Sequence, residues 1–204
     1  MLEVAMPEAA AAPALPIGAS GRNSVGWPGM LCLIATESSL FAYLLFSYYY
    51  MALQHGPEWL PERHPSIALA GPNTLVLLAS SAAVWWGEAG IKHARRGQHL
   101  IGLGAGIALG VTFLVVQGFE WKAKPFRLDT SSYGSLFFTV TGFHMAHVLV
   151  GVLVLATVFL WSVLGYFSPR HHARMTIASI YWHFVDVVWL FVFSTFYLSP
   201  WVLA

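Results

Sequence analysis

The chain has 204 residues, of which 57% are hydrophobic and only 9% are charged, and its formal net charge is +1. Soluble domains usually carry about 25% charged residues, so this composition excludes an ordinary water-soluble domain and indicates a bilayer as the solvent. The small net charge gives no basic field that would attract nucleic acid. The single cysteine, Cys32, excludes an internal disulfide and lies in an apolar run, where we expect a small core residue.

Residues 1–26 form an Ala/Pro-rich segment that has no apolar core of signal-peptide length. We expect a disordered tail and not a cleaved signal, so that the first membrane helix itself directs insertion. The rest of the chain, 27–204, is expected to form one membrane domain.

Five later stretches are apolar enough to cross a bilayer, which takes about 20 residues per helix. In chain order they cover 27–54, 70–92, 99–122, 134–165 and 174–200. The connectors between them hold prolines and most of the charges. The predicted fold class is therefore an all-α integral membrane bundle of five transmembrane helices.

The basic residues of the connectors predict the orientation, because Lys and Arg are enriched in cytoplasmic loops. With five spans, one side of the membrane carries Arg22, Lys92, Arg95, Arg96, Arg170 and Arg174. The other side carries Arg63, Lys122, Lys124 and Arg127. This bias predicts that the N-terminus is inside and the C-terminus outside.

Ionisable residues inside a span are costly and are functional candidates by default. Glu37 lies well inside the first span, and His183 and Asp186 lie one turn apart on the fifth, on one helical face. We expect His183 and Asp186 to pair. All three side chains lie at comparable depth, so they would form one polar cluster if the first and fifth spans touch.

Other polar residues fall nearer the ends of spans or on the fourth span. Glu88 and Glu120 are expected to reach the membrane interface. Gln117 and Glu120 are one turn apart on the third span, as His144 and His147 are on the fourth, and we expect these four to contribute to an interhelical polar network. Two histidines on one helical face cannot reach opposite sides of one heme, and they supply too few ligands for a four-coordinate metal. We therefore expect neither catalytic nor metal-ligating residues in this chain.

Several motifs resemble, in order, those of heme-copper terminal oxidase subunit III, the family that serves cytochrome c and quinol oxidases. Residues 36–42 read TESSLFA, 72–81 read PNTLVLLASS and 117–121 read QGFEW. Residues 133–138 read YGSLFF, 141–148 read TGFHMAHV and 181–191 read YWHFVDVVWLF. The resemblance is collinear from about residue 26 to the end. The chain is similar to the short five-helix bacterial form.

The resemblance implies a subunit that itself holds no redox centre. Family members bind no heme or copper, which belong to the partner subunits, and pack directly on the catalytic subunit I beside the entrance of a proton-uptake channel. Subunit II and small subunits complete the complex. Members sustain proton uptake, protect the catalytic centre during turnover and bind phospholipids in a cleft, through which an oxygen route has been suggested.

Residue by residue, Glu37 corresponds to the buried acid of the family, and His183 and Asp186 to its WHFxD pair. Glu120, His144 and His147 fall on their motif positions. The chain departs from mitochondrial-type members at Thr176, where those members carry an acid. Any network that uses this acid must differ here.

The sequence thus predicts a non-catalytic oxidase subunit in a bacterial cytoplasmic membrane, where Glu37, His183 and Asp186 support proton uptake or bind lipid headgroups. Three alternatives remain. The accessory protein of nitric oxide reductase systems has the same fold and a similar motif. A diheme cytochrome would use His144, His147 and His183 as ligands, and an autonomous proton channel would be built around Glu37.

Overall fold

The structure is a computed structural model that describes residues 26–61, 66–167 and 173–203. Its long helices are α1 (Gly26–His55), α2 (Ile67–Lys92), α3 (Arg96–Ala123), α4 (Ser132–Val163) and α5 (Ala173–Phe193). The short elements are η1 (Pro57–Trp59), η2 (Ser194–Leu198) and α6 (Pro200–Leu203). Five helices are long and apolar enough to cross a membrane, the last running through Ser194–Leu198, so the predicted five-span bundle is confirmed.

The helix ends follow from local chemistry. Ser66 and Ser131 cap α2 and α4, and their hydroxyls accept hydrogen bonds from the backbone N–H groups of Ala68 and Gly134 at 3.2 and 3.1 Å. The fourth span ends two residues earlier than predicted, and Gly165 follows it with φ of 83°. The sequence did not predict η2, a π-helical turn in which the N–H of Ser199 donates to the carbonyl of Ser194.

The predicted tail, 1–26, lies outside the described residues except for Gly26, which is the first residue of α1. Arg22, Arg63 and Arg170, three of the residues that predict the orientation, also lie outside them. The inside position of the N-terminus therefore stays a prediction.

Trp182 of α5 lies at the centre of the core formed by α2 to α5. Its side chain is fully buried, and its indole N–H donates to the hydroxyl of Ser80 on α2 at 3.1 Å. A side chain at Gly110 of α3 or Gly151 of α4 would collide with the Trp182 ring. Lipid is as apolar as these helices, so the hydrophobic effect does not drive them together. Close packing of this kind is what holds them in contact.

The helices α2 and α3 approach most closely at a pair of glycines. A Cβ atom added to Gly102 would lie 2.6 Å from the Cα atom of Gly87, so the two backbones touch. This contact makes α2 and α3 a tight hairpin, with Ala94 at φ of 57° in its turn.

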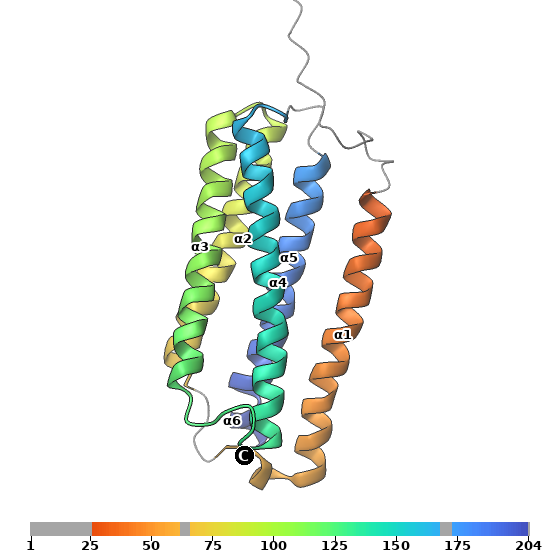
Figure 1. Cartoon of the computed structure of the whole chain (residues 1–204), viewed down its shortest axis with the longest axis vertical. Coiled ribbons are helices and arrows are strands. Elements are labelled where there is room, and N and C mark those ends of the chain that lie inside the picture. The colour runs from red at the N-terminus through yellow and green to blue at the C-terminus, as the bar shows by residue number, and fades with distance from the viewer. Residues whose placement is uncertain (1–25, 62–65, 168–172, 204) are drawn as a thin grey trace, which may run out of the picture.

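Helix α1 lies at one side of the other helices and diverges from them towards its start (Figure 1). Its buried residues are Phe41, Tyr48 and Ala52, all in the second half of the helix. The prediction for Cys32 is wrong, because this residue is exposed on the first half. An apolar run in a membrane protein can face lipid as readily as a core, so hydropathy alone could not place it.

Candidate functional site

Glu37 and His147 form the polar contact that joins α1 to α4. The Glu37 Oε2 atom lies 3.0 Å from the His147 Nε2 atom, and both side chains are largely buried. The His147 Nδ1 atom lies 2.7 Å from the carbonyl oxygen of Phe143. A carbonyl only accepts, so Nδ1 carries a proton.

This tautomer constrains the proton between the two side chains. Since Nδ1 carries its own proton, Nε2 of neutral His147 is an acceptor, and a carboxylate could not bond to it. Either a protonated Glu37 donates to Nε2, or a His147 imidazolium donates to a Glu37 carboxylate. In both forms the pair shares one proton and has no net charge.

Two aromatic residues hold this pair in place. The Phe41 ring centroid lies 5.1 Å from that of His147, and the Tyr181 hydroxyl of α5 donates to the His147 carbonyl at 3.4 Å. The pair is thus located where α1, α4 and α5 meet.

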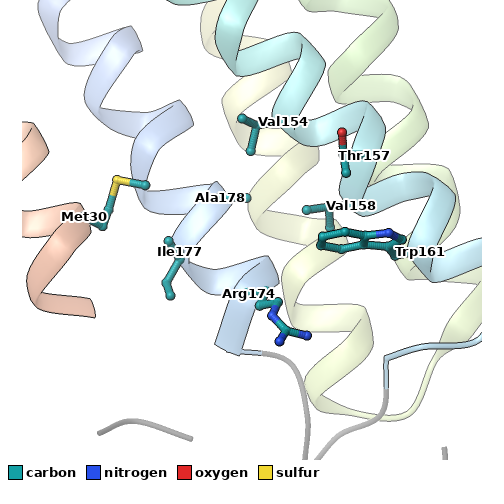
Figure 2. Close-up of a pocket in the computed structure, with 8 residues that line it drawn as sticks. All are labelled: Met30, Val154, Thr157, Val158, Trp161, Arg174, Ile177 and Ala178. Atoms are coloured by element: carbon teal, nitrogen blue, oxygen red, sulfur yellow. The ribbon is translucent and has the colours of Figure 1, made fainter. Parts of the chain in front are cut away.

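An open cavity of about 280 Å³ lies next to this meeting point, between α1, α4 and the start of α5 (Figure 2). Its lining is mainly apolar and consists of Met30, Val154, Thr157, Val158, Trp161, Arg174, Ile177 and Ala178. Met30 precedes Glu37 and Val154 follows His147 by about two helical turns, or roughly 10 Å. The cavity therefore extends from the neighbourhood of the pair towards the end of the bundle where α1 begins.

The predicted cluster of Glu37, His183 and Asp186 is wrong. The α5 face that carries His183 and Asp186 packs against α2, whereas Glu37 bonds to α4. The predicted His183–Asp186 pair is also wrong, since the described residues give no ion pair between them. The i,i+3 spacing did predict the shared face correctly, but it could not say which helix that face meets.

The two ring nitrogens of His183 bond to hydroxyls on both helices. Nδ1 bonds to Ser81 of α2, and Nε2 lies 3.2 Å from the Ser179 hydroxyl on its own helix. Asp186 is 4% exposed, and neither carboxylate oxygen has a hydrogen-bond partner among the described residues. Ser81 lies in the motif at 72–81 and Ser179 in an apolar run, but neither pattern indicated that these serines would bond to His183.

Nearer the end of α2, Glu88 completes a polar line along the same α2–α5 boundary. Its Oε1 atom accepts from Lys92 Nζ at 2.7 Å and from the Thr176 hydroxyl at 2.9 Å. The Lys92 side chain is 47% exposed, so it extends from the buried carboxylate to the surface.

At the other end of the bundle, Glu120 bonds to Lys124 and Tyr197, which the sequence did not identify as its partners. Its Oε1 atom accepts from Lys124 Nζ at 2.6 Å and from the Tyr197 hydroxyl at 2.7 Å. The side chains of Glu120 and Lys124 are only 5% and 7% exposed. The i,i+4 spacing of these two residues was the signal that could have predicted the pair.

Of the four residues predicted to contribute to an interhelical polar network, Glu120 and His147 do bond to other helices, but to different partners. Gln117 is buried beside Tyr197, and its amide makes no hydrogen bond in the described part of the chain. His144 is fully buried beside Trp189, whose ring centroid is 4.9 Å away, and neither ring nitrogen bonds to a described residue. Across residues 26–61, 66–167 and 173–203, no three His, Cys, Asp or Glu side chains gather as metal ligands would.

Comparison with known proteins identifies the family to which this bundle belongs. The sequence model of the family described as "Cytochrome c oxidase subunit III" matches residues 23–201, most of the chain. The chain belongs to the cytochrome c oxidase subunit III family. With its five spans it is a multi-pass membrane protein.

Individual relatives agree with this family assignment. A protein of Marchantia polymorpha named cytochrome c oxidase subunit 3 is 36% identical over 179 residues, which cover 83% of this chain and 66% of the relative. One of the same name from Balaenoptera musculus is 38% identical over 176 residues, covering 83% and 67%. The chain thus spans about two thirds of the length of these subunit III proteins.

The structure shows what lies beside Thr176, where the resemblance led us to expect a polar network that differs from the mitochondrial type. Here the Thr176 hydroxyl donates to Glu88, so a carboxylate is still present at this point, supplied by α2.

Proposed function

We propose that this chain is the non-catalytic subunit III of a proton-pumping heme-copper oxidase that reduces oxygen to water. The single observation that carries the proposal is the family match across residues 23–201. In this proposal, heme and copper belong to the partner subunits, and the chain packs directly on the catalytic subunit I, with subunit II and small subunits completing the complex. The membrane is the bacterial cytoplasmic membrane.

Within this role, Glu37 and His147 support proton uptake by the catalytic subunit. A pair that shares one proton stays neutral whichever atom holds it, so it avoids the cost of an isolated charge in the membrane. That proton can move between Glu37 Oε2 and His147 Nε2 along the hydrogen bond that joins these two atoms at 3.0 Å. A polar point of this kind favours ordered water next to the partner subunit's proton entrance.

The cavity beside α1 binds a phospholipid in this proposal. Its apolar walls, with Met30 and Val154, suit an acyl chain, and Arg174 and Trp161 line it where a headgroup phosphate would lie. The loose packing of the first half of α1 leaves room for such a lipid. Bound lipid then completes the contact between α1 and the other helices.

The test is an affinity purification of the tagged chain from membranes in mild detergent, with an optical spectrum, a subunit list and an oxygen-consumption assay. A co-purifying partner that contains heme and copper and consumes oxygen supports the proposal. A nitric oxide reductase as the partner, or a chain that purifies alone, contradicts it. A Soret band from the chain alone would indicate a membrane cytochrome.

A second measurement tests the supporting role directly. Oxidase depleted of this chain should take up protons more slowly and inactivate after fewer turnovers, with unchanged heme spectra. Equal turnover and equal lifetime would contradict the role. Proton flux in liposomes that contain this chain alone, abolished by Glu37→Gln, would indicate a channel instead.

A further inference from the structure

Helices α2 and α5 pack against each other, and their contact contains a line of hydrogen-bonding side chains. The line begins near the end of α2, where Lys92 bonds to Glu88 at 2.7 Å. It ends at Asp186, which lies halfway along the span Ala173–Leu198. It runs from 81 to 88 on α2 and from 179 to 186 on α5, a rise of roughly 10 Å on each helix. Three side chains lie between the two carboxyls: Ser179, His183 and Ser81.

Each member of this line is a neighbour of the next one. The Ser179 hydroxyl adjoins the Glu88 carboxyl and lies 3.2 Å from His183 Nε2. The other ring nitrogen, Nδ1, bonds to the Ser81 hydroxyl, and Ser81 is also the side-chain neighbour of Asp186. A hydroxyl and a neutral imidazole can each donate one hydrogen bond and accept another. The line therefore has the composition of a proton relay between two acids.

The end of the line at Asp186 is closed. This side chain is 4% exposed, and neither of its oxygens has a hydrogen-bond partner among the described residues. No ion pair joins it to a cation in the described part of the chain. A carboxylate without compensation is costly at this depth, so Asp186 carries a proton at rest. The neighbouring Ser81 is the side chain through which that proton can leave.

The end of the line at Glu88 is connected to water through Lys92. The Glu88 residue is 7% exposed, whereas the Lys92 side chain is 47% exposed. The Lys92 ammonium can give a proton to Glu88 and take another from water, which restores the ion pair after each transfer. Thr176 also donates to Glu88, at 2.9 Å, but its hydroxyl bonds to no other described member of the line.

We propose that this line is a proton relay that loads and unloads Asp186 from the side of the membrane on which Lys92 lies. The proposal goes beyond the proposed function, which places proton support at Glu37 and His147 on the α1–α4 side. It holds for any partner of the chain, because every member of the relay belongs to α2 or α5. Asp186 is then a proton store in the middle of the membrane.

The unloading step moves one proton across each hydrogen bond of the relay. The Asp186 hydroxyl gives its proton to the Ser81 oxygen, while Ser81 gives its own proton to His183 Nδ1. At the same time His183 gives its Nε2 proton to Ser179, and the Ser179 hydroxyl gives its own to Glu88. Each intermediate member loses one proton and gains one. Asp186 thus becomes a carboxylate, Glu88 becomes a carboxylic acid, and His183 stays neutral.

Because the relay ends at Asp186, it works as a store and not as a channel. The reverse shift returns each proton along the same hydrogen bonds, and His183 alternates between its two neutral tautomers. The ring and the hydroxyls therefore keep their places between loading and unloading. A line that conducts protons through the membrane would have to reorient these groups after every transfer.

Exchange of the Asp186 proton for deuterium tests the relay. The full chain, purified with the partners that it retains, is mixed with D₂O and followed by infrared spectroscopy. The carboxyl C=O band of Asp186 is the band that Asp186→Asn removes. We expect Ser179→Ala to slow its exchange by roughly a hundredfold, the lower end of what a positioned proton-transfer group contributes. Thr176→Val is the matched control, because it removes a hydroxyl from Glu88 but leaves the relay complete.

Equal exchange rates in Ser179→Ala and Thr176→Val would overturn the relay, because water would then reach Asp186 by another path. The absence of a C=O band that depends on Asp186 would also overturn it, since the carboxyl would be ionised at rest. Ser81→Ala interrupts the relay at its other end and should slow the exchange similarly. This second variant keeps the test decisive if Ser179→Ala does not fold.

The tautomer of His183 provides a second readout. Nitrogen-15 NMR of histidine-labelled protein reports it, and the His183 signals are those that His183→Gln removes. We expect the neutral tautomer with its proton on Nε2, because Ser81 donates to Nδ1 while Asp186 holds its proton. An imidazolium, or a resting ring with its proton on Nδ1, would overturn the relay.

Discussion

Helix α1 and the four helices α2 to α5 differ in how they are held. The core buries Trp182 of α5 between α2, α3 and α4 and brings the α2 and α3 backbones into contact at Gly87 and Gly102. Helix α1 buries three residues in its second half, where Tyr48 and Tyr49 also bond to Ser199 and Thr195, and its first half bonds to the core through Glu37. The core is therefore stabilised by close packing, while the first half of α1 depends on one polar pair and on what fills the cavity beside it.

The strongest test of the core is Lys124→Met. It removes the cation beside Glu120, whose side chain is only 5% exposed. Breaking a buried ion pair by removing one partner costs about 3–5 kcal/mol, because the remaining charge is left without compensation. We expect a decrease of about 4 kcal/mol in the free energy of unfolding, measured by SDS titration in micelles.

Lys122→Met is the matched control for this prediction, because Lys122 is exposed at the end of the same helix. It should leave the unfolding free energy nearly unchanged. Adding Glu120→Gln to Lys124→Met should recover part of the loss, since the uncompensated charge is then gone. If Lys124→Met alone changed the free energy of unfolding only slightly, the Glu120 carboxylate would not be shielded from water at this end of the bundle.

The next largest effect is expected from Gly102→Leu. The new Cβ atom would lie 2.6 Å from Gly87 Cα and 2.7 Å from the Ala83 carbonyl oxygen, so α2 and α3 must move apart. Overpacking typically costs about 1–3 kcal/mol, and backbone contacts cannot relax by rotamer changes. Gly118→Leu on the same helix meets nothing within 4 Å and should be tolerated. The same SDS titration compares the two, and equal losses would contradict the tight α2–α3 contact.

The attachment of α1 should respond more weakly. Glu37→Leu removes the bond to His147, and interhelical hydrogen bonds in membranes are worth about 0.6 kcal/mol on average and 1.7 at most. We expect a loss of about 1 kcal/mol and faster proteolysis of the connector that follows α1. Glu37→Gln should be milder, because its amide N–H can donate to His147 Nε2. If Glu37→Leu lowered the free energy of unfolding as much as Lys124→Met does, α1 would be held as tightly as the helices of the core.

The sequence could predict the helices but not their neighbours. Hydropathy located all five spans within a few residues, because about 20 apolar residues are an unambiguous signal. The partners of Glu37 and His183 depend on which helix faces touch, and a 3.6-residue period says nothing about that. The sequence predicted that His147 makes polar contacts between helices, but only the structure showed that its partner is Glu37. The π-helical turn at Ser194–Leu198 left no pattern to find.

The smallest decrease in the free energy of unfolding is expected from Thr176→Val, a change within the core. The change removes one hydroxyl from Glu88 but leaves Lys92 in place at 2.7 Å. A single hydrogen bond contributes about 0.5–1.5 kcal/mol net, and the remaining ion pair limits the loss to the lower end. Thr157→Val on α4 is the control, because the Thr157 hydroxyl donates to the Leu153 carbonyl of its own helix and to no other residue in the described part of the chain.

Thr176→Glu gives the same position a sharper test, measured by the same titration. It places a second carboxylate beside Glu88, where one Lys92 must serve both, so we expect a larger loss than for Thr176→Val. Adding Glu88→Gln should reverse that loss, since one carboxylate then remains between α2 and α5, now supplied by α5. If Thr176→Glu alone caused no loss, Lys92 could compensate two carboxylates at once, and this end of the α2–α5 boundary would not be limited to one acid.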